Sequence, residues 1–411
     1  MKKLMSGLLV VLLLACVGLP ALAEEAQTTL TYWQHSSEAR NQMIDVLVQE
    51  FMEANPDIVI EVEYIPSADY TTKLIPALAT GTGPDVFQIQ SGMVSTLASI
   101  GSIQPLDETI MPTDSIAEEF VASTVDALLY EGRYYGMPTD TQTIVVFWNK
   151  ALVEAAGLDA ENGPATWEEF YEWARILTVT DEDGQLVQAG WGTNGYWPEV
   201  QSYIESMGGT FYDDETGLFV FADDPVSVEA VETMAALYLE DKVYDVEFGS
   251  RWACFRQGLI GLMLGHPAMI GNLAITAPDV EIGVGIIPGN GDNRLTCVTS
   301  WAYVMSSQAP TAEATRFIEF LGSEEVEKRW TLSTGELPAR AALLTDEELN
   351  ADPKVATAIA SLNNSVVGNL QTSALNSIWG DNWDKIMLTD ESIASILATC
   401  QDELNAELQG E

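Results

Sequence analysis

Cationic side chains are scarce in this chain of 411 residues, and their scarcity excludes whole classes of partner. The sequence has 17 Lys and Arg residues against 62 Asp and Glu, which gives a formal net charge of −45 at pH 7. A chain this acidic repels nucleic acid and anionic lipid head groups, so neither is expected as a partner. We interpret the charge as the strongly solvated exterior of an exported protein, and a cationic ligand stays open as the alternative.

Histidine and cysteine are also rare. His35 and His266 are the only histidines, and the four cysteines are far apart without the spacing of a metal site. Zinc-ligand spacing, a nucleophile elbow and a phosphate loop are all missing from the sequence, so we expect no metal, no cofactor and no catalysis. Cys400 lies on an apolar helical face and is predicted to be a buried thiol. A disulfide between Cys254 and Cys297 is the alternative left open for the other two cysteines that follow the N-terminal segment.

Long apolar runs are confined to the N-terminus. Two lysines precede the apolar stretch Leu4–Ala15, and the small residues Ala21 and Ala23 form a cleavage site, so residues 1–23 are predicted to be a secretory signal peptide. The stretch is shorter than the roughly 20 apolar residues that a membrane span needs. Removing residues 1–23 takes the net charge to −47. We expect an exported protein, periplasmic or extracellular, and a lipid anchor at Cys16 is the less favoured alternative.

The rest of the composition predicts a globular protein with more than one domain. Hydrophobic residues make up 47% of the chain and charged residues 19%, which is enough for two cores of about 190 residues each. Near the N-terminus, apolar and periodic segments alternate as strand, helix, strand, helix, strand at residues 28–33, 44–51, 58–64, 70–80 and 86–89. This alternation predicts a mainly parallel sheet flanked by helices. Ligands bind such sheets at the carboxyl ends of the strands, here residues 33–37 and 90–93.

The stretch Glu131–Asn149 predicts a strand that leaves one domain and enters another. A polar run, residues 139–143, precedes the apolar strand 144–148, and Pro138 suits a strand edge rather than the middle of a sheet. An ordinary hairpin is the alternative. Residues 280–288 are predicted to make the return crossing, and two crossings make a hinge. The expected division is a first lobe of residues 24–138 and 285–325 and a second of residues 139–284 and 326–411.

An ordered series of short motifs spans almost the whole chain after the signal peptide. It comprises ATGTGPDVF (79–87), YGMPTDTQT and FWNK (135–150), EAAGL (154–158), TWEEF (166–170), FRQGLIGLML (255–264), IPG (287–289), RFIEFL (316–321) and TGELPAR (334–340). The series resembles the extracellular solute-binding proteins of family 1, which serve ATP-binding-cassette importers of sugars and include the maltodextrin-binding protein as a distant relative. The resemblance implies a two-lobed α/β fold of the periplasmic-binding-protein type II. It further implies a ligand cleft between the lobes, no catalysis, a monomer, and a membrane permease as partner.

The sequence departs from that family at one position. Many members have a tryptophan after the glycine of the segment Met269-Ile270-Gly271, where this chain has Asn272, so hydrogen bonds are expected there in place of an aromatic platform. By resemblance, Trp379 matches the family's aromatic residue in the late helical segment. Gln142 matches a polar cleft residue on the crossing strand.

A sugar site needs aromatic plates for the C–H face of the ring and polar groups for its hydroxyls. The aromatic candidates are Trp191, Tyr196, Trp197, Trp252, Trp301 and Trp379, each of which is equally plausible as a core residue. The polar candidates are His35, Gln90, Asp140, Gln142, Asn194, Asn272 and Glu336.

Two rival functions stay open. The same fold could bind a non-sugar solute, either a polyamine held by carboxylates or a glycerophosphodiester clamped by arginines such as Arg251, Arg256, Arg294 and Arg340. A secreted glycosidase with two catalytic carboxylates is the third reading. With 62 acids, a pair at a suitable separation would arise by chance.

Overall fold

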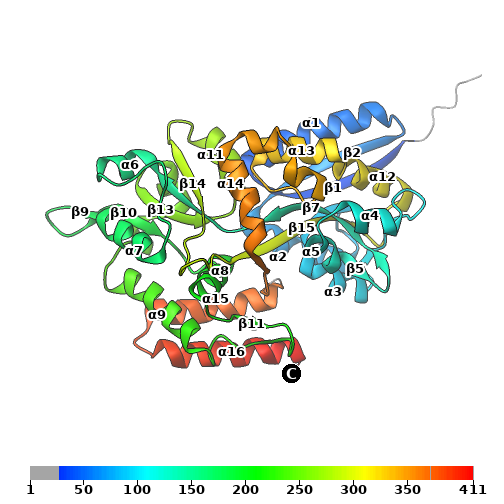
Figure 1. The fold of residues 1–411 in the computed structure, drawn as a ribbon. Helices are drawn as coiled ribbons and strands as arrows, with labels where there is room; N and C mark the ends of the chain where they lie inside the picture. The colour runs from blue at the N-terminus through cyan, green and yellow to red at the C-terminus, as the bar shows by residue number, and fades with distance from the viewer. Residues whose placement is uncertain (1–26, 371, 411) are drawn as a thin grey trace, which may run out of the picture.

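The computed structural model describes residues 27–370 and 372–410 (Figure 1). The predicted signal peptide and Cys16 lie outside these residues. Within the described residues, sixteen strands are arranged in two main sheets and two small hairpins. In the described part of the chain, none of the helices is both long and apolar enough to cross a membrane.

The first sheet has the order β16-β15-β3-β1-β2, and β4 and β7 also pair with β15. Its strands are β1 (Thr28–Ser36), β2 (Ile58–Pro66), β3 (Val86–Gln90), β4 (Ile103–Gln104), β7 (Gly136–Gln142), β15 (Thr296–Ser306) and β16 (Ser365–Val367). The second sheet has the order β14-β8-β13-β10-β9. Its strands are β8 (Val145–Asn149), β9 (Val179–Thr180), β10 (Leu186–Gly192), β13 (Ile260–Gly265) and β14 (Ile282–Ile286). The hairpins are β5 (Leu129–Tyr130) with β6 (Arg133–Tyr134) and β11 (Tyr212–Asp213) with β12 (Leu218–Phe219).

Helices cover both sheets (Figure 1). The α-helices are α1 (Glu38–Ala54), α2 (Ser67–Thr80), α3 (Val94–Ser99), α4 (Thr113–Glu119), α5 (Ala122–Val125), α6 (Lys150–Ala155), α7 (Trp167–Ile176), α8 (Trp197–Met207), α9 (Pro225–Leu239), α10 (Arg251–Arg256), α11 (Ala268–Thr276), α12 (Thr311–Leu321), α13 (Glu324–Thr334), α14 (Pro353–Ser361), α15 (Ser373–Leu388) and α16 (Ile393–Gln409). Short 3₁₀ turns occupy Ser91–Met93, Asp126–Leu128, Val246–Phe248, Ala341–Thr345, Leu349–Ala351 and Leu362–Asn364.

Local chemistry explains where the helices begin and end. The Ser37 hydroxyl accepts the Arg40 amide N–H and starts α1. Thr166 and Glu169 form a capping box at α7. Helix α2 ends at Gly81, whose φ of +68° is left-handed and favours glycine.

The predicted strand–helix alternation is confirmed as β1-α1-β2-α2-β3, with β1 parallel to both β2 and β3. The sheets as a whole are mixed rather than mainly parallel, because β15 enters antiparallel to β3, β4 and β7. In the second sheet, β8 likewise runs antiparallel to β13 and β14. The two-lobed α/β fold is therefore present, with mixed sheets in both lobes.

The chain passes between the two lobes at three places. It goes from β7 to β8, from β14 to β15, and from α13 to α14. The predicted return crossing at residues 280–288 is wrong, since β14 pairs along its length with β8 and stays in the second sheet. Strand β15 makes the return itself. Its start, with Cys297, packs in the second core, and its end, Ala302–Met305, packs in the first.

Core membership differs from the expected lobe division at two places. Helix α13 packs into the first core through Val326 and Trp330, and β14 belongs to the second sheet. We therefore propose lobe boundaries after Gln142, at β15, and near Arg340. Cys254, Cys297 and Cys400 are free and buried, so the disulfide alternative is wrong.

Candidate functional site

Polar side chains gather at the carboxyl ends of the strands in the first sheet. Gln34 and His35 end β1, Gln88 and Gln90 end β3, and all but Gln90 are almost fully buried. The Gln34 Nε2 atom, the His35 Nδ1 atom and both polar side-chain atoms of Gln88 have no hydrogen-bond partner in the protein. Because buried polar groups are normally paired, this concentration of unpaired atoms makes this end of the sheet the candidate ligand site.

An aromatic pair lies at the same end of the sheet. The His35 ring stacks on Trp301 of β15, with centroids 4.0 Å apart and an interplanar angle of 26°, and the Tyr70 ring meets His35 edge-on at 5.7 Å. Trp301 is half-buried and sits opposite Gln90 and Asp140 in the strand register. Burial, and then the charge of Arg40, lower the pKa of His35 well below its usual value, so this imidazole is neutral. The structure thus brings three other predicted residues, His35, Gln90 and Asp140, next to the half-exposed indole of Trp301.

Asp140, Gln142 and Glu336 form a neighbouring group of polar side chains. The Gln142 amide donates to Asp140 Oδ1 at 3.2 Å, while Asp140 Oδ2 and Gln142 Oε1 have no hydrogen-bond partner. Glu336 forms an ion pair with Arg40 of α1. The backbone of Thr141 in β7 is also joined to Leu337 by two hydrogen bonds, of 2.8 and 3.2 Å. Segments nearly 200 residues apart in the sequence therefore meet here.

The second lobe contributes a second polar group, on the loops after β10 and β13. His266 Nδ1 donates to the Thr143 carbonyl at 2.9 Å, so its Nε2 accepts the Tyr196 hydroxyl at 3.1 Å. Burial lowers the pKa of His266 to about 4, with smaller contributions from Arg40 and Arg251, so it is neutral at pH 7. The charge of Arg40, in the first lobe, acts to lower the pKa of both Tyr196 and His266.

The second lobe also contains a buried ion pair. Arg251, the first residue of α10, contacts both carboxylate oxygens of Glu199 on α8, at 2.7 and 2.8 Å. The Arg251 guanidinium lies 5.4 Å from the ring of Trp252, and its Nε has no hydrogen-bond partner. Burial raises the pKa of Glu199 to about 7, against the lowering effect of Arg251.

The other predicted residues lie elsewhere. Trp191, Trp197 and Trp379 are each less than 5% exposed and belong to the core of the second lobe. The ring of Trp191 packs edge-on against Phe170, and the Trp379 indole donates to the Gly195 carbonyl, so these rings support the loops from behind.

Asn194 is exposed in the loop before α8, and Trp252 is half-buried. Asn272 is half-buried on α11 and accepts the Thr276 hydroxyl through its carbonyl and side-chain oxygens.

Five residues of the site were absent from the predicted set: Gln34, Arg40, Gln88, Glu199 and His266. Gln88 did carry a signal, because it lies between apolar residues of a short strand, and Gln34 directly precedes the predicted residue His35. Arg40, Glu199 and His266 carried none. Their partners are 52 to about 300 positions away in the sequence.

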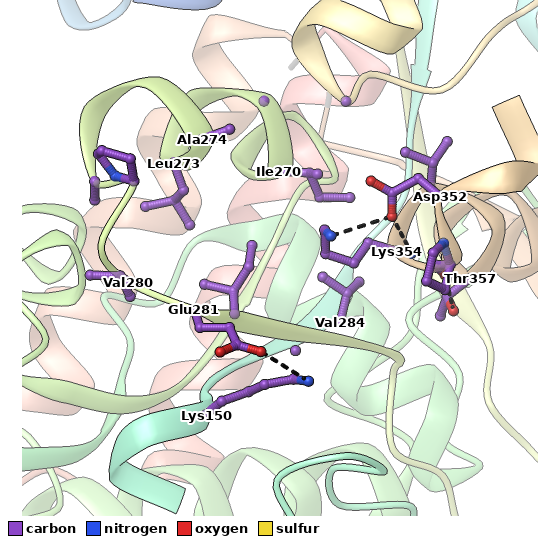
Figure 2. A pocket seen from close by; sticks show the side chains of 18 of the residues that line it. Lys150, Ile270, Leu273, Ala274, Val280, Glu281, Val284, Asp352, Lys354 and Thr357 are labelled. Atoms are coloured by element: carbon purple, nitrogen blue, oxygen red, sulfur yellow. Dashed lines mark hydrogen bonds and ion pairs between the residues drawn. The ribbon is translucent and has the colours of Figure 1, made fainter. Parts of the chain in front are cut away.

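A separate cavity of about 640 Å³ lies between α11, α13, α14 and the edge strand β14. Figure 2 shows its apolar lining, with Lys150 beside Glu281 and Lys354 beside Asp352. None of the thirteen predicted ligand residues lines it. Among the described side chains with unpaired buried atoms, only Thr331 reaches it. This apolar cavity is not the polar site.

Two glycines lie where the lobes touch. A Cβ on Gly271 of α11 would come within 2.5 Å of the backbone of Ser333 and Thr334 at the end of α13. A Cβ on Gly335 would lie 2.6 Å from the Pro267 carbonyl oxygen. The second lobe therefore approaches the first here at a distance that only glycine allows.

Gly271→Ala is expected to separate the lobes at this contact. Small-angle scattering should show a larger radius of gyration, although alanine favours a helix by about 1 kcal/mol over glycine. Gly380→Ala is the matched control, since Gly380 lies in α15 with nothing within 4 Å of its added Cβ. The control should raise stability without changing the radius. Equal radii for the two variants would contradict the close contact.

Comparison with known proteins agrees with this architecture. The family model of the bacterial extracellular solute-binding proteins matches residues 36–328. The chain belongs to this family. The maltotriose-binding protein of Pyrococcus abyssi is 23% identical over 403 residues, covering 94% of this chain and 84% of the relative. The sn-glycerol-3-phosphate-binding periplasmic protein of Salmonella typhimurium is 24% identical, covering 77% of this chain and 75% of its own length.

Solved structures of other solute-binding proteins share the fold. An ABC substrate-binding protein of Listeria monocytogenes, in complex with cycloalternan, superposes with a TM-score of 0.81 and 23% identity, covering 93% of this chain and 99% of that one. A solute-binding protein of Thermotoga lettingae, bound to α-D-tagatose, gives a TM-score of 0.82 and 21% identity, covering 93% and 100%. The two-lobed fold of this solute-binding protein is the fold of these structures.

Proposed function

We propose that this solute-binding protein captures a sugar or short oligosaccharide between its lobes and delivers it, as a monomer and without chemical change, to an ATP-binding-cassette importer. The observation that carries the proposal is the half-exposed Trp301 ring, backed by His35 and surrounded by buried polar atoms without partners. A pyranose has an apolar face for the ring and hydroxyls for these atoms.

The charges of the site favour a neutral solute. Arg40 is paired with Glu336 and Arg251 with Glu199, and both histidines are neutral. A phosphate would have to compete with an internal carboxylate for either arginine. A polyamine that bound Glu336 or Glu199 would likewise have to displace an arginine from its carboxylate, and buried charges are costly to leave unpaired.

The relatives bear on the choice between solutes. Three carry sugars in their names or bound in their structures: the maltotriose-binding protein, the cycloalternan complex and the tagatose complex. The glycerol-3-phosphate-binding relative keeps an anionic solute as the second candidate. Internal pairing of both site arginines is the reason to place it second.

Capture would proceed by a shift between open and closed arrangements of the lobes. A solute that contacts Trp301 in the first lobe and Tyr196 and His266 in the second at the same time stabilises the closed form, because it binds the closed form more tightly than the open form. The closed form then presents a distinct surface to the permease.

Isothermal titration calorimetry with a panel of solutes tests the assignment. The panel should contain maltose, maltotriose, mannobiose, tagatose, sn-glycerol 3-phosphate and spermidine. We expect binding by at least one sugar and none by the charged solutes. Binding of glycerol 3-phosphate alone would transfer the assignment to the second candidate, and a panel without any binding sugar would end the sugar proposal.

Trp301→Ala is expected to weaken binding of that sugar by about tenfold to a hundredfold, equivalent to about 1.4–2.8 kcal/mol. The loss follows from removing the plate on which the sugar ring stacks. Trp33→Ala is the matched control, because Trp33 is half-buried in the same lobe and its ring is covered by the Lys73 ammonium at 4.6 Å. If both variants bind the sugar as the unchanged protein does, Trp301 is not the platform.

A further inference from the structure

The apolar cavity of about 640 Å³ is bounded by both lobes. Most of its lining comes from α11, β14 and α14 in the second lobe, where Leu273 and Val355 belong to one buried cluster. The remaining side is the end of α13, residues 331–333, and this helix packs into the first core through Trp330. A molecule that fills the cavity would therefore touch both lobes.

The interior of the cavity offers an apolar surface and one unsatisfied hydroxyl. Figure 2 shows Ile270 and Leu273 of α11 on one side and Val284 of β14 on the other. Thr331 of α13 also lines the cavity, is fully buried, and its hydroxyl has no hydrogen-bond partner among the described residues. The volume is in the range of about 300–1,000 Å³ that is usual for small-molecule sites. A mainly apolar molecule with one hydrogen-bonding group would suit this lining.

The charged groups at the rim decide the charge of the ligand. The Lys150 ammonium lies 3.0 Å from Glu161 and 3.4 Å from Glu281, and the Lys354 ammonium lies 3.4 Å from Asp352. Two cations against three carboxylates leave a net charge of −1, so an anionic head group would be repelled. The carboxylates are between 41% and 76% exposed, so a cation would gain little from them. A neutral ligand is favoured.

Large apolar side chains are exposed at the rim, one from each lobe. Ile275 of α11 is 39% exposed and Leu332 of α13 is 45% exposed, and both line the cavity. A bound apolar molecule that covered them would remove apolar surface of both lobes from water, which is favourable. The same molecule would then hold α13 against α11.

The cavity also adjoins the closest contact between the lobes. Gly271 and Gly335 both line it, and these are the glycines at which the backbones of α11 and α13 nearly touch. The next residue, Glu336, pairs with Arg40 in the polar site. A ligand that favours one arrangement of the lobes at this contact changes the affinity of any solute that also bridges them, and the effect is reciprocal.

We propose that this cavity is a second binding site, for a small neutral and mainly apolar molecule with one hydrogen-bonding group, and that its occupant changes the affinity of the polar site. The effect on the polar site rests on the proposed function. Binding in the cavity does not.

Fluorescence titration with Nile red, a neutral apolar dye, tests the site without any sugar. We expect saturable binding to the unchanged protein, and Val284→Asp should weaken it at least tenfold by placing a carboxylate in the lining. Val62→Asp is the matched control, because Val62 is also a half-buried valine on an edge strand, β2, and does not line the cavity. Absence of saturable binding, or equal affinity in the two variants, would overturn the site.

A second variant guards against misfolding of Val284→Asp. Ala274 lines the cavity from α11 and is exposed, so Ala274→Glu adds a charge at the rim without burying it. Dye affinity should fall severalfold, and denaturant unfolding should match that of the unchanged protein. Unaltered dye affinity in a folded Ala274→Glu variant would also contradict the proposal.

Displacement of Nile red by three eight-carbon probes tests the charge of the ligand. The probes are 1-octanol, octanoate and octylamine, which at pH 7 are neutral, anionic and cationic. We expect 1-octanol to displace the dye at the lowest concentration. Displacement at a lower concentration by either charged probe would overturn the neutral class.

Calorimetry tests the coupling, with the sugar that binds in the solute panel. Its Kd should change at least threefold when 1-octanol is present at saturation, and Val284→Asp should abolish the change. An unaltered Kd contradicts the coupling. If no sugar binds, the proposed function fails, and the dye titrations still decide whether the cavity is a binding site.

Discussion

Arg251→Ala is expected to lower the free energy of unfolding by about 3–5 kcal/mol. The side chains of Arg251 and Glu199 are 7% and 1% exposed, so the variant leaves a carboxylate buried without its counter-charge. Denaturant unfolding at pH 8 measures the loss. At lower pH Glu199, whose folded pKa is about 7 even with Arg251 present, takes up a proton, so the loss should shrink as pH falls.

An exposed ion pair in the same lobe provides the control. Arg175 contacts Asp241 at 2.7 Å, but its side chain is 54% exposed, and such pairs contribute about 0–1 kcal/mol. Arg175→Ala should therefore be nearly neutral at both pH values. If the two arginine variants lose similar amounts of stability, the Arg251–Glu199 pair is not buried as the structure has it.

Trp191→Ala should also destabilise the protein by about 3–5 kcal/mol, because it opens a cavity beside Phe170 in the second core. In contrast with Trp301→Ala, it should leave sugar affinity unchanged at temperatures where the variant is folded. Denaturant unfolding and calorimetry on the same preparation separate the two effects. If Trp191→Ala kept normal stability and lost sugar affinity, the Trp191 ring would belong to the ligand site, an alternative that the sequence alone left open.

Periodicity and motif order predicted a large part of the fold. The alternation that became β1-α1-β2-α2-β3 was visible because each element is a continuous segment with its own pattern and cap. The motif series also indicated two lobes, and the family match over residues 36–328 agrees.

The predicted site was less complete, for a reason that the tryptophans make clear. Trp191, Trp197 and Trp301 all follow or flank polar or glycine-containing segments in the sequence, yet the first two are buried in a core and only the third is half-exposed. Which way an indole points depends on the packing partners of its strand or helix, and local spacing does not encode them. The return crossing was misplaced for the same reason, since the pairing of β14 with β8 joins residues about 135 positions apart.

The sequence by itself determined the acidic surface, the scarcity of groups for metal or nucleophilic chemistry, the local elements, and the resemblance to solute-binding proteins. These follow from composition and from patterns within single segments. Only the tertiary structure decided which aromatic rings are buried in a core and which is half-exposed beside unpaired polar atoms, and which carboxylate pairs with each arginine. Those facts depend on contacts between distant segments, and on the burial that makes an unpaired charge or polar atom costly.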